Sequence, residues 1–440
     1  MRALPVAFLL ALFTACGGGD DDEIVEDLDQ DGDGVVGSLD CDDTDSSTFP
    51  GAPEVCDGID NNCDGTADEE LQREHFADQD GDGFGDPSSA QLGCEVPAGR
   101  VEDGTDCDDS SPLVSPGAPE VCDGIDNDCD ASTTEAGLAS VFDPTDGSFA
   151  QDISTELATP SPGLFSGAPA LLQVCDGTFY PNFAIGADFD LVGIGDVILD
   201  GNDERRMFVI DGEAGTAGAR LSLTNVTLTG GSAPDVTVYG DGGFRFELGA
   251  AVLCRGEDNY VALDQVLVEG NSAQGGAVAI IEGCDAGIVN SEFTDNVGDF
   301  ANSIYAFGSL VDIDETHIHA NLNEGLYGGA GGAVYASVRG QIVLNNSIVE
   351  QPDGAAVVLF NNDANTAPTL TCNGTSSVGA GLLRSKWGVL VDSSHPVRGD
   401  FVACDLQGNT VDIFRPASTN VTLNRRDVSG YFTEWESSLY

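Results

Sequence analysis

Acidic residues with a regular spacing near the N-terminus suggest sites for a hard cation. The segment DQDGDGVVGSLDCDDTD, which begins at Asp29, is dense in carboxylates and has no basic residue. Such like charges repel one another unless a counterion lies between them. This segment has acids at positions 1, 3, 5 and 12, a glycine at position 6 and a backbone carbonyl at position 7: Asp29, Asp31, Asp33, Asp40, Gly34 and Val35. This is the ligand spacing of a twelve-residue calcium loop.

Two more segments repeat this spacing. The segment DQDGDGFGD provides Asp78, Asp80, Asp82 and Asp86, with Gly83 at position 6 and Ser89 in place of the acid at position 12. The segment DNNCDGTADEE provides Asp60, Asn62, Asp64 and Asp68, with Gly65 at the turn and Glu69 or Glu70 as a bidentate donor. Because the donors are all oxygens, the predicted cofactor is calcium. The alternative is a solvated, disordered acidic stretch, which would require neither this spacing nor the cysteines within it.

The acidic region is duplicated. The text PGAPEVCDGIDNNCDG begins at Pro50, and PGAPEVCDGIDNDCDA begins 66 residues later at Pro116. The second copy carries Ala131 where the first has Gly65, and alanine resists a positive φ. We therefore expect the loop at Asp126 to bind a cation more weakly or not at all.

Disulfides or bound cations must hold these repeats together, because apolar residues are too sparse there to build a core. The chain has 13 cysteines, and those other than Cys16 form an even set, which favours disulfides in an exported chain. Spacing favours the bridges Cys254–Cys284 and Cys372–Cys404. The repeats and the C-terminal part each have an odd number of cysteines, and a Cys129–Cys175 bridge would balance both. The pairing is not settled by the sequence.

The N-terminus has the features of an export signal. Arg2 precedes the apolar run Ala3–Phe13, which is too short to span a bilayer as a mature helix. The text FTAC that ends at Cys16 resembles the lipobox of bacterial lipoproteins, with Phe13 where leucine is more usual. The resemblance implies cleavage before Cys16, a lipid on its sulfur and localisation at the outer membrane or cell surface. An ordinary secretory signal with an incidental cysteine is the alternative.

Composition divides the remainder of the chain. The 440 residues carry a formal net charge of −61, which makes nucleic acid and anionic membrane surfaces poor partners. Acids are concentrated before Gly137, and the rest is rich in Gly, Val, Leu, Asn and Thr. The expected domains are a signal peptide at 1–15, a tether at 16–26, two metal-binding repeats at 27–137 and a β domain at 138–440.

The duplicated unit resembles a metal-binding repeat of bacterial exported proteins that is named after a methanotroph outer-membrane copper-binding protein. The texts that carry the resemblance are DxDGDGxGD, DCDD, PGAPEVCDGIDNNCDG and ADEE, over about residues 27–135. The loops also look like those of thrombospondin type 3 repeats, because no amphipathic helices flank them as in EF-hands. Membership implies metal binding. Copper in the namesake relies on histidine, whereas this region has His75 alone and no methionine, so calcium is favoured.

The C-terminal part repeats an eleven-residue motif. It begins at Leu221, Val261, Ala286, Val311 and Ile342, with a later member at Val421. Positions 1, 3 and 8 are apolar in nearly all copies, which predicts a strand, a bend and a second inward residue. Glycine clusters such as GGAVAI and GGAVYA are expected to begin another strand in each coil. An amide recurs at position 5, and we expect it to form a ladder of hydrogen bonds between coils.

This part resembles the right-handed parallel β-helices of the pectin-lyase-like superfamily, and FTDN and GGAVYA resemble polymorphic outer-membrane-protein repeats. The resemblance covers about residues 165–435 and implies an all-β solenoid, preceded by small, loop-rich repeats stabilised by disulfides and calcium. Phe293 and Ile313 are expected to point inward in adjacent coils.

The superfamily includes polysaccharide lyases and glycoside hydrolases, so an active site must be considered. Asp312 and Asp314 are candidate carboxylates, and His317 and His319, two residues apart, would share one strand face. A solvated strand face explains the same residues. The preferred function is therefore non-catalytic: a lipid-anchored, calcium-binding protein that presents a β-helix for adhesion to a glycan or protein. The alternative is a carbohydrate-active enzyme of that superfamily.

Overall fold

The computed structural model describes most of the chain after the N-terminal segment. The described residues are 28–143, 149–158, 170–211, 218–233, 236–239, 244–323, 331–351, 354–361, 367–373, 377–378, 387–393, 397–402, 411–416, 421–426 and 434–437. The predicted signal peptide, Cys16 and the tether lie outside them. Within the described part, no helix is both long and apolar enough to cross a membrane.

The chain divides into two compact units, one ending at Ala118 and the other beginning at Pro119. In the first unit, turns and bends outnumber strands. Strand β1 (Arg73–Ala77) pairs antiparallel with β2 (Gln91–Gly93) and with β3 (Arg100–Val101). The short 3-10 helix η1 (Pro87–Ser89) lies between β1 and β2 in the sequence.

Disulfides connect the loops of the first unit. Cys41 is bonded to Cys63, and Cys56 to Cys94. Cys94 has no counterpart at the corresponding place in the other repeat, and its partner Cys56 explains why it stands between the copies. The loop-rich, disulfide-bonded character predicted for the repeats is therefore what this unit shows.

The second unit is nearly all β, and most of its strands pair in parallel. Its one described α-helix is α1 (Ser154–Leu157), next to the antiparallel strands β4 (Ala139–Phe142) and β5 (Phe149–Asp152). One set of parallel strands comprises β6 (Ala170–Phe179), β8 (Phe189–Asp200), β10 (Arg220–Thr224), β11 (Thr227–Thr229), β15 (Tyr260–Asp264), β16 (Leu267–Glu269), β18 (Asp285–Val289), β19 (Glu292–Thr294), β22 (Leu310–Asp314), β23 (His317–Ile318), β26 (Gln341–Asn345), β27 (Ile348–Val349), β29 (Thr369–Asn373), β30 (Ser377–Val378), β32 (Val397–Val402) and β34 (Val421–Arg426).

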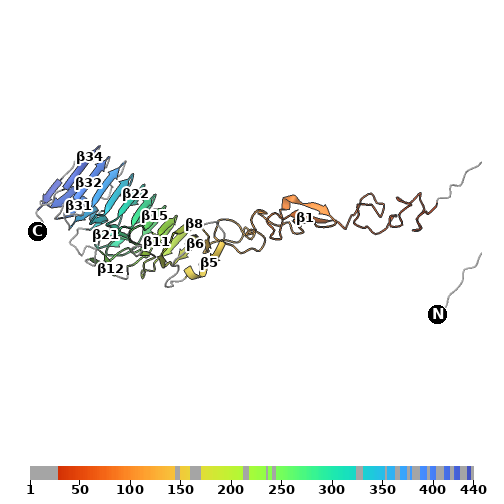
Figure 1. The fold of residues 1–440 in the computed structure, drawn as a ribbon, viewed down its shortest axis with the longest axis horizontal. Helices are drawn as coiled ribbons and strands as arrows, with labels where there is room; N and C mark the ends of the chain where they lie inside the picture. The colour runs from red at the N-terminus through yellow and green to blue at the C-terminus, as the bar shows by residue number, and fades with distance from the viewer. Residues whose placement is uncertain are drawn as a thin grey trace, which may run out of the picture. The chain divides into compact units, whose positions relative to one another are not determined.

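A second parallel sheet contains the strands that follow the glycine clusters. It comprises β7 (Phe183–Ile185), β9 (Phe208–Asp211), β14 (Val252–Arg255), β17 (Val278–Ile281), β21 (Ala301–Phe307), β25 (Gly332–Ser337), β28 (Ala355–Asn361), β31 (Trp387–Ser393), β33 (Val411–Pro416) and β35 (Glu434–Ser437). Two small pairs remain, β12 (Val236–Tyr239) with β13 (Phe244–Glu247) and β20 (Val297–Gly298) with β24 (Leu322–Asn323). In Figure 1, the labelled strands β6, β8, β11, β15, β22, β32 and β34 follow one another in chain order.

The register of these strands confirms the alignment of the eleven-residue motif. Its first positions pair directly, from Leu221 to Val261, Ala286, Val311 and Ile342. The eighth positions also pair, for example Val268 with Phe293 and Phe293 with Ile318. Side chains at positions 1, 3 and 8 enter one hydrophobic core, in which Phe293 and Ile313 are each 0% exposed. Both residues therefore point inward as predicted.

The predicted ladder at position 5 links neighbouring coils through partners other than amides: Asn290 Nδ2 donates to Asp264 Oδ1 and Asn346 Nδ2 to Asp314 Oδ1, each at 3.3 Å. Its members Asn225, Gln265, Asn290, Glu315 and Asn346 are exposed and have φ between 47° and 56°. This left-handed bend, which asparagine tolerates, turns the side chains outward.

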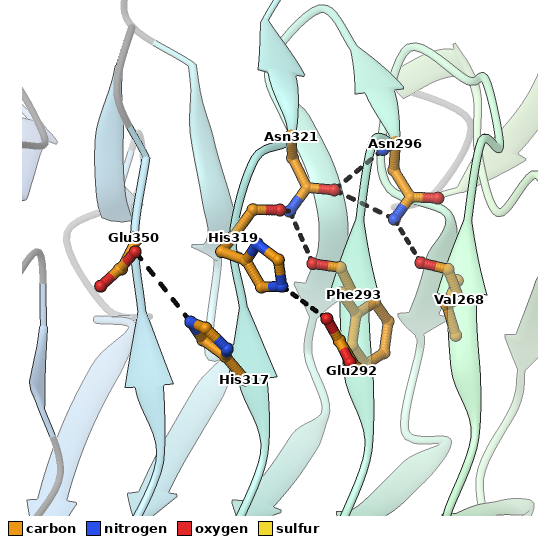
Figure 2. Close-up of polar contacts among 8 residues, drawn as sticks. All are labelled: Val268, Glu292, Phe293, Asn296, His317, His319, Asn321 and Glu350. Atoms are coloured by element: carbon orange, nitrogen blue, oxygen red, sulfur yellow. Dashed lines mark hydrogen bonds and ion pairs between the residues drawn. The ribbon is translucent and has the colours of Figure 1, made fainter. Parts of the chain in front are cut away.

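A ladder of asparagines that bond amide to amide lies at position 11, where the side chains are buried. Asn271 Nδ2 donates to Asn296 Oδ1 and Asn296 Nδ2 donates to Asn321 Oδ1, each at 3.0 Å. Asn296 Nδ2 and Asn321 Nδ2 also donate to the carbonyls of Val268 and Phe293 (Figure 2). Each amide thus satisfies backbone groups that burial would otherwise leave without partners.

Disulfides in the second unit agree with the sequence in one case and differ in another. Cys254 and Cys284 are bonded, as predicted. Cys175 is bonded to Cys122 and not to Cys129, because the backbone N–H of Cys122 donates to Ser140 on β4, which pairs with the strand that carries Cys175. Cys372 is disulfide-bonded, and its predicted partner Cys404 lies outside the described residues.

Candidate metal centres

The loop at Asp29 is held by hydrogen bonds that use both oxygens of Asp29 but only one oxygen of Asp31, Asp33 and Asp40. Asp29 Oδ1 accepts from the N–H of Gly32 at 2.6 Å, and its Oδ2 accepts from Gly34 at 3.1 Å. Asp31 Oδ1 and Asp33 Oδ1 each accept from the backbone N–H two residues ahead. Gly34 has a φ of 103°, which explains why glycine stands at position 6.

The other oxygens of this loop are buried without a partner. They are Asp31 Oδ2, Asp33 Oδ2 and Asp40 Oδ2. The pKa of Asp31 is raised, first by burial and then by the charges of Asp33, Asp40 and Asp29. Buried anionic oxygens without donors are costly, and a cation among them would remove that cost. We call Asp29, Asp31, Asp33 and Asp40 the first acidic cluster.

The loop at Asp78 has the same geometry. Asp78 Oδ1 accepts from Gly81 at 2.7 Å, Asp80 Oδ1 from Asp82 at 3.2 Å, and Asp82 Oδ1 from Phe84 at 2.9 Å. Asp80 Oδ2 and Asp82 Oδ2 are again buried without a partner. Gly83, at position 6, has a φ of 104°, so the two loops turn alike.

The acid that completes this second loop is Asp106, which the spacing of the sequence did not indicate. Its backbone N–H donates to the carbonyl of Gly85, at position 8, just as the N–H of Asp40 donates to Val36 at position 8 of the first loop (3.3 and 3.1 Å). Asp106 is 2% exposed, and its Oδ2 is a third buried oxygen without a partner. Its pKa is raised by burial and then by Asp82, Asp80 and Asp109. We call Asp78, Asp80, Asp82 and Asp106 the second acidic cluster.

The last acid of the DCDD text also contacts the backbone of each loop. Asp43 Oδ1 accepts from the N–H of Gln30 at 2.9 Å, and Asp109 Oδ1 accepts from Gln79 at 2.7 Å. Asp109 also raises the pKa of Asp80. The repetition of CDD at Cys41 and Cys107 was the signal in the sequence that could have assigned Asp106 and Asp109 to the loop at Asp78.

Asp86 lines one pocket with Asp106 and Asp109, but it and Ser89 also make hydrogen bonds of their own. Asp86 caps η1, where its two oxygens accept from the backbone N–H and the hydroxyl of Ser88, both at 2.7 Å. The hydrogen bonds from Ser88 lower the pKa of Asp86. Ser89 Oγ accepts from Ala77 on β1 and donates to the carbonyl of Asp86. The inserted segment between Gly85 and Asp106 thus forms its own small structure and returns the chain to the loop.

The loop at Asp60 matches the pattern less well. Asp60 accepts from Asp64 and Gly65, and Asn62 Oδ1 accepts from Asp64 at 2.9 Å. Asp68 is only 8% exposed, but its carboxylate accepts from the N–H groups of Asp57 and Gly58, each at 3.0 Å. Its Oδ1 therefore stabilises the backbone at Asp57 and Gly58.

Two glutamates contact the Asp60 loop. Glu69 Oε1 accepts from Asn62 Nδ2, and Glu69 Oε2 is buried without a partner. Glu54, which the sequence did not indicate, accepts from the N–H groups of Asn62 and Asp68 at 2.8 and 3.0 Å. Glu54 therefore closes the loop by accepting from the loop's backbone N–H groups. Glu69 Oε2 is the oxygen that lacks a hydrogen-bond donor.

The loop at Asp126, in the second unit, has the features expected from Ala131. Asp130 Oδ1 accepts from the N–H and the hydroxyl of Ser132, which lowers the pKa of Asp130. Ala131 is not among the described residues with positive φ, whereas Gly65 has a φ of 102°. No described carboxylate of this loop is buried without a partner, although burial and then the charges of Asp128, Asp126 and Glu135 raise the pKa of Glu120.

The donors of the two acidic clusters are all oxygens. His75 is 3% exposed, and its Nδ1 accepts from Arg100 Nε at 2.6 Å, so this histidine stabilises β1 and β3. Cys41, Cys63 and Cys107 lie near the acids but are disulfide-bonded and offer no thiolate. The residues present therefore fit a hard cation such as calcium better than copper.

The candidate catalytic acids of the second unit are paired with asparagines. Asp312 Oδ1 accepts from Asn345 at 2.7 Å, and Asp314 Oδ1 accepts from Asn346 at 3.3 Å. The pKa of Asp312 is raised by burial and then by Asp314. His317 and His319 do share one face, as predicted, and their rings stack with centroids 4.1 Å apart.

Comparison with known proteins identifies one related motif. The family model Cu-binding MopE, described as "Putative metal-binding motif", matches residues 40–69 and 106–135. The two matches begin at Asp40 and Asp106, the acids that complete the two clusters. They cover a minor part of the chain, and they support binding of some metal. Among the curated proteins and the solved structures, none matches this chain.

Proposed function

We propose that this protein is an exported, calcium-binding protein whose acidic repeats become ordered when the ion binds. The observation that carries the proposal is the matched set of oxygens in the two acidic clusters: Oδ2 of Asp31, Asp33, Asp40, Asp80, Asp82 and Asp106. Each set of three is buried without a donor, next to further carboxylates. A divalent ion turns this repulsion into attraction, and its binding free energy then contributes to folding.

Calcium is the proposed ion because the donors are hard oxygens in flexible loops, with glycine at the turn. The absence of histidine and thiolate from both clusters is the reason to set copper aside, despite the name of the matching family model. Loops of extracellular modules bind calcium with dissociation constants of about 10⁻⁴–10⁻³ M, which suits an exported protein.

We further propose that the second unit is a right-handed parallel β-helix. The direct pairing of successive motif copies, and the alternation between the two parallel sets of strands, support a chain that coils repeatedly. The buried asparagines at position 11 add hydrogen bonds between successive coils. Such a rod presents a long side to a partner.

The proposed role of this rod is adhesion to a glycan or protein at the cell surface, with the chain anchored through lipid on Cys16. The lipobox-like FTAC text supports the anchor and a place at the outer membrane. Asp312 and Asp314 would carry the alternative, a polysaccharide lyase or glycoside hydrolase. Their pairing with asparagines supports the non-catalytic role.

Calcium titration of the purified full chain by calorimetry, after chelation, tests the proposal. We expect two sites of similar affinity and a rise in the unfolding temperature of the first unit. The variant Asp40→Asn should remove one site, whereas Asp42→Asn, which changes the same charge at an exposed acid next to it, should retain both. Equal loss in the two variants, or no binding heat in the wild type, would overturn the proposal.

A further inference from the structure

Three neighbouring strands of the second unit bring two histidines and two glutamates to one outer face. His317 on β23 pairs with Glu292 on β19 on one side and with Ile348 on β27 on the other. Ile318 lies between the histidines and is 0% exposed, so His317 and His319 both point outward. Glu350 follows β27, and its N–H donates to the carbonyl of Ile318 at 2.7 Å.

Figure 2 shows the four side chains as two neighbouring pairs, Glu292 with His319 and Glu350 with His317. His319 Nε2 lies 2.6 Å from Glu292 Oε1, and His317 Nε2 lies 4.0 Å from Glu350 Oε2. One ligand atom from each of Glu292, His317 and His319 lies within 4.8 Å of the other two. The stacked imidazoles are inclined by 29°.

The backbone beneath these side chains is held in place. Asn321 Nδ2 donates to the carbonyl of His319 at 2.7 Å and to that of Phe293 at 3.0 Å. Ile318 and Phe293 anchor β23 and β19 in the core. The positions of Glu292 and His319 are therefore set by the asparagine ladder and by two buried side chains, as a preorganised site requires.

Hydrogen bonding among the four residues is incomplete. His317 Nε2 is buried at the atomic level and has no hydrogen-bond partner, although it faces the carboxylate of Glu350, whose side chain is 17% exposed. A metal ion bound by this nitrogen and by the carboxylates would give the nitrogen a partner.

We propose that Glu292, His317, His319 and Glu350 form a site for a divalent transition-metal ion of the zinc class. Two imidazoles and two carboxylates are ligands that zinc accepts in a tetrahedral arrangement. Ligand atoms around such an ion lie roughly 3.3 Å apart, given metal–ligand distances near 2.0–2.1 Å.

The site differs in chemistry and effect from the acidic clusters. Its mixed nitrogen and oxygen donors favour a borderline ion over calcium. Its ligands come from three successive strand layers, so the bound ion cross-links β19, β23 and the end of β27. Binding should therefore stabilise the second unit and leave the first unit unaffected.

Zinc titration of the purified full chain, with excess calcium present to fill the acidic clusters, tests this proposal. We expect one zinc ion per chain and a higher unfolding temperature of the second unit. Cobalt, used as a spectroscopic probe, should give the visible absorption bands of a tetrahedral site. His317→Gln and His319→Gln should each lower zinc affinity at least about tenfold and abolish the cobalt bands.

Glu269→Gln is the matched control. Glu269, on β16, occupies position 9 of the eleven-residue motif, as His319 does in its own copy. It should bind zinc and cobalt as the wild type does. If either histidine variant fails to fold by circular dichroism, Glu292→Gln and Glu350→Gln replace it. Wild-type protein that binds no zinc, or histidine variants that keep its stoichiometry and cobalt spectrum, would overturn the proposal.

Discussion

The backbone N–H of Asp106 donates to the carbonyl of Gly85, 3.3 Å away, and thereby closes a loop that a long insertion interrupts. The first loop closes in the same way without an insertion, through Asp40 and Val36. In both, the closing aspartate leaves Oδ2 buried and without a donor. The DCDD text therefore has one structural role in both copies, and its distance along the chain from the DxDxDG text is free to vary.

Asp106→Asn should weaken calcium binding by the second acidic cluster, whereas Asp86→Asn should not. Asparagine keeps the size of the side chain but removes its charge and places an amide where the buried Oδ2 of Asp106 stands, so we expect an affinity loss of about tenfold or more. Asp86 caps η1, so its variant should change stability by about 1 kcal/mol at most. Calorimetric titration of both variants measures the difference. The reverse ranking would restore Asp86 as the ligand that the sequence suggested.

Without calcium, the first unit should gain stability as the pH falls. The pKa values of Asp31, Asp80 and Asp106 are raised from 3.8. A carboxyl with a raised pKa in the folded state opposes folding when ionised, and this penalty is absent at low pH and complete above the raised pKa. The unfolding temperature of the chelated protein should therefore rise as the pH is lowered from neutrality towards 3.8.

Calcium should reverse this pH dependence, because protons then compete with the bound ion. Serine hydrogen bonds lower the pKa values of Asp45 and Asp86, and these two residues make stability fall as the pH is lowered. Comparison of the wild type with Asp31→Asn therefore isolates the contribution of the first acidic cluster. Scanning calorimetry of both proteins, with and without chelator, measures the effect. An Asp31→Asn protein with the same pH dependence as the wild type would assign it to other groups.

Asn296→Ala should destabilise the second unit strongly. The substitution removes the donor to Val268 and to Asn321, and the acceptor for Asn271, all within the core. Several buried groups lose partners at once, so we expect a loss of about 3 kcal/mol or more in the free energy of unfolding. The control is Asn290→Gly at exposed position 5, where φ is 50° and glycine fits, so its cost should be well below 1 kcal/mol. Equal costs in urea unfolding would contradict a ladder at position 11.

Ile313→Asp should unfold the second unit or lower its stability by about 4 kcal/mol or more, because an unpaired charge would enter the core. Ile313 is 0% exposed. Val289→Asp, on the neighbouring strand but 36% exposed, should cost about 1 kcal/mol at most. Equal unfolding temperatures for the two variants would mean that the register is wrong.

Cys16→Ser should release the protein from membranes. This prediction rests on the FTAC text alone, since Cys16 lies outside the described residues. Fractionation of the producing cells and mass spectrometry of the N-terminal peptide measure it. Continued membrane retention of the variant, with no lipid on Cys16 in the wild type, would support the simple secretory signal instead.

The sequence by itself determined the features that depend on local spacing. The DxDxDG texts fixed the turn glycines Gly34 and Gly83, and the eleven-residue motif fixed which strands pair and which side chains, such as Phe293 and Ile313, are buried. Both follow from periodicities of two to twelve residues, over which backbone geometry leaves few choices. Gly65 has a φ of 102°, whereas Ala131 is not among the described residues with positive φ, as expected because alanine resists that conformation.

The tertiary structure alone decided which distant groups meet. Asp106 meets the loop at Asp78 because the inserted strands β2 and β3 return the chain to Gly85, and no local spacing encodes that return. Cys122 takes Cys175 because β4 and β6 pair. The amide ladder lies at position 11 because a left-handed bend turns position 5 outward, and Glu350 reaches His317 only through the stacking of β23 and β27. Such contacts depend on how loops close, and long-range closure leaves little trace in the residues on either side.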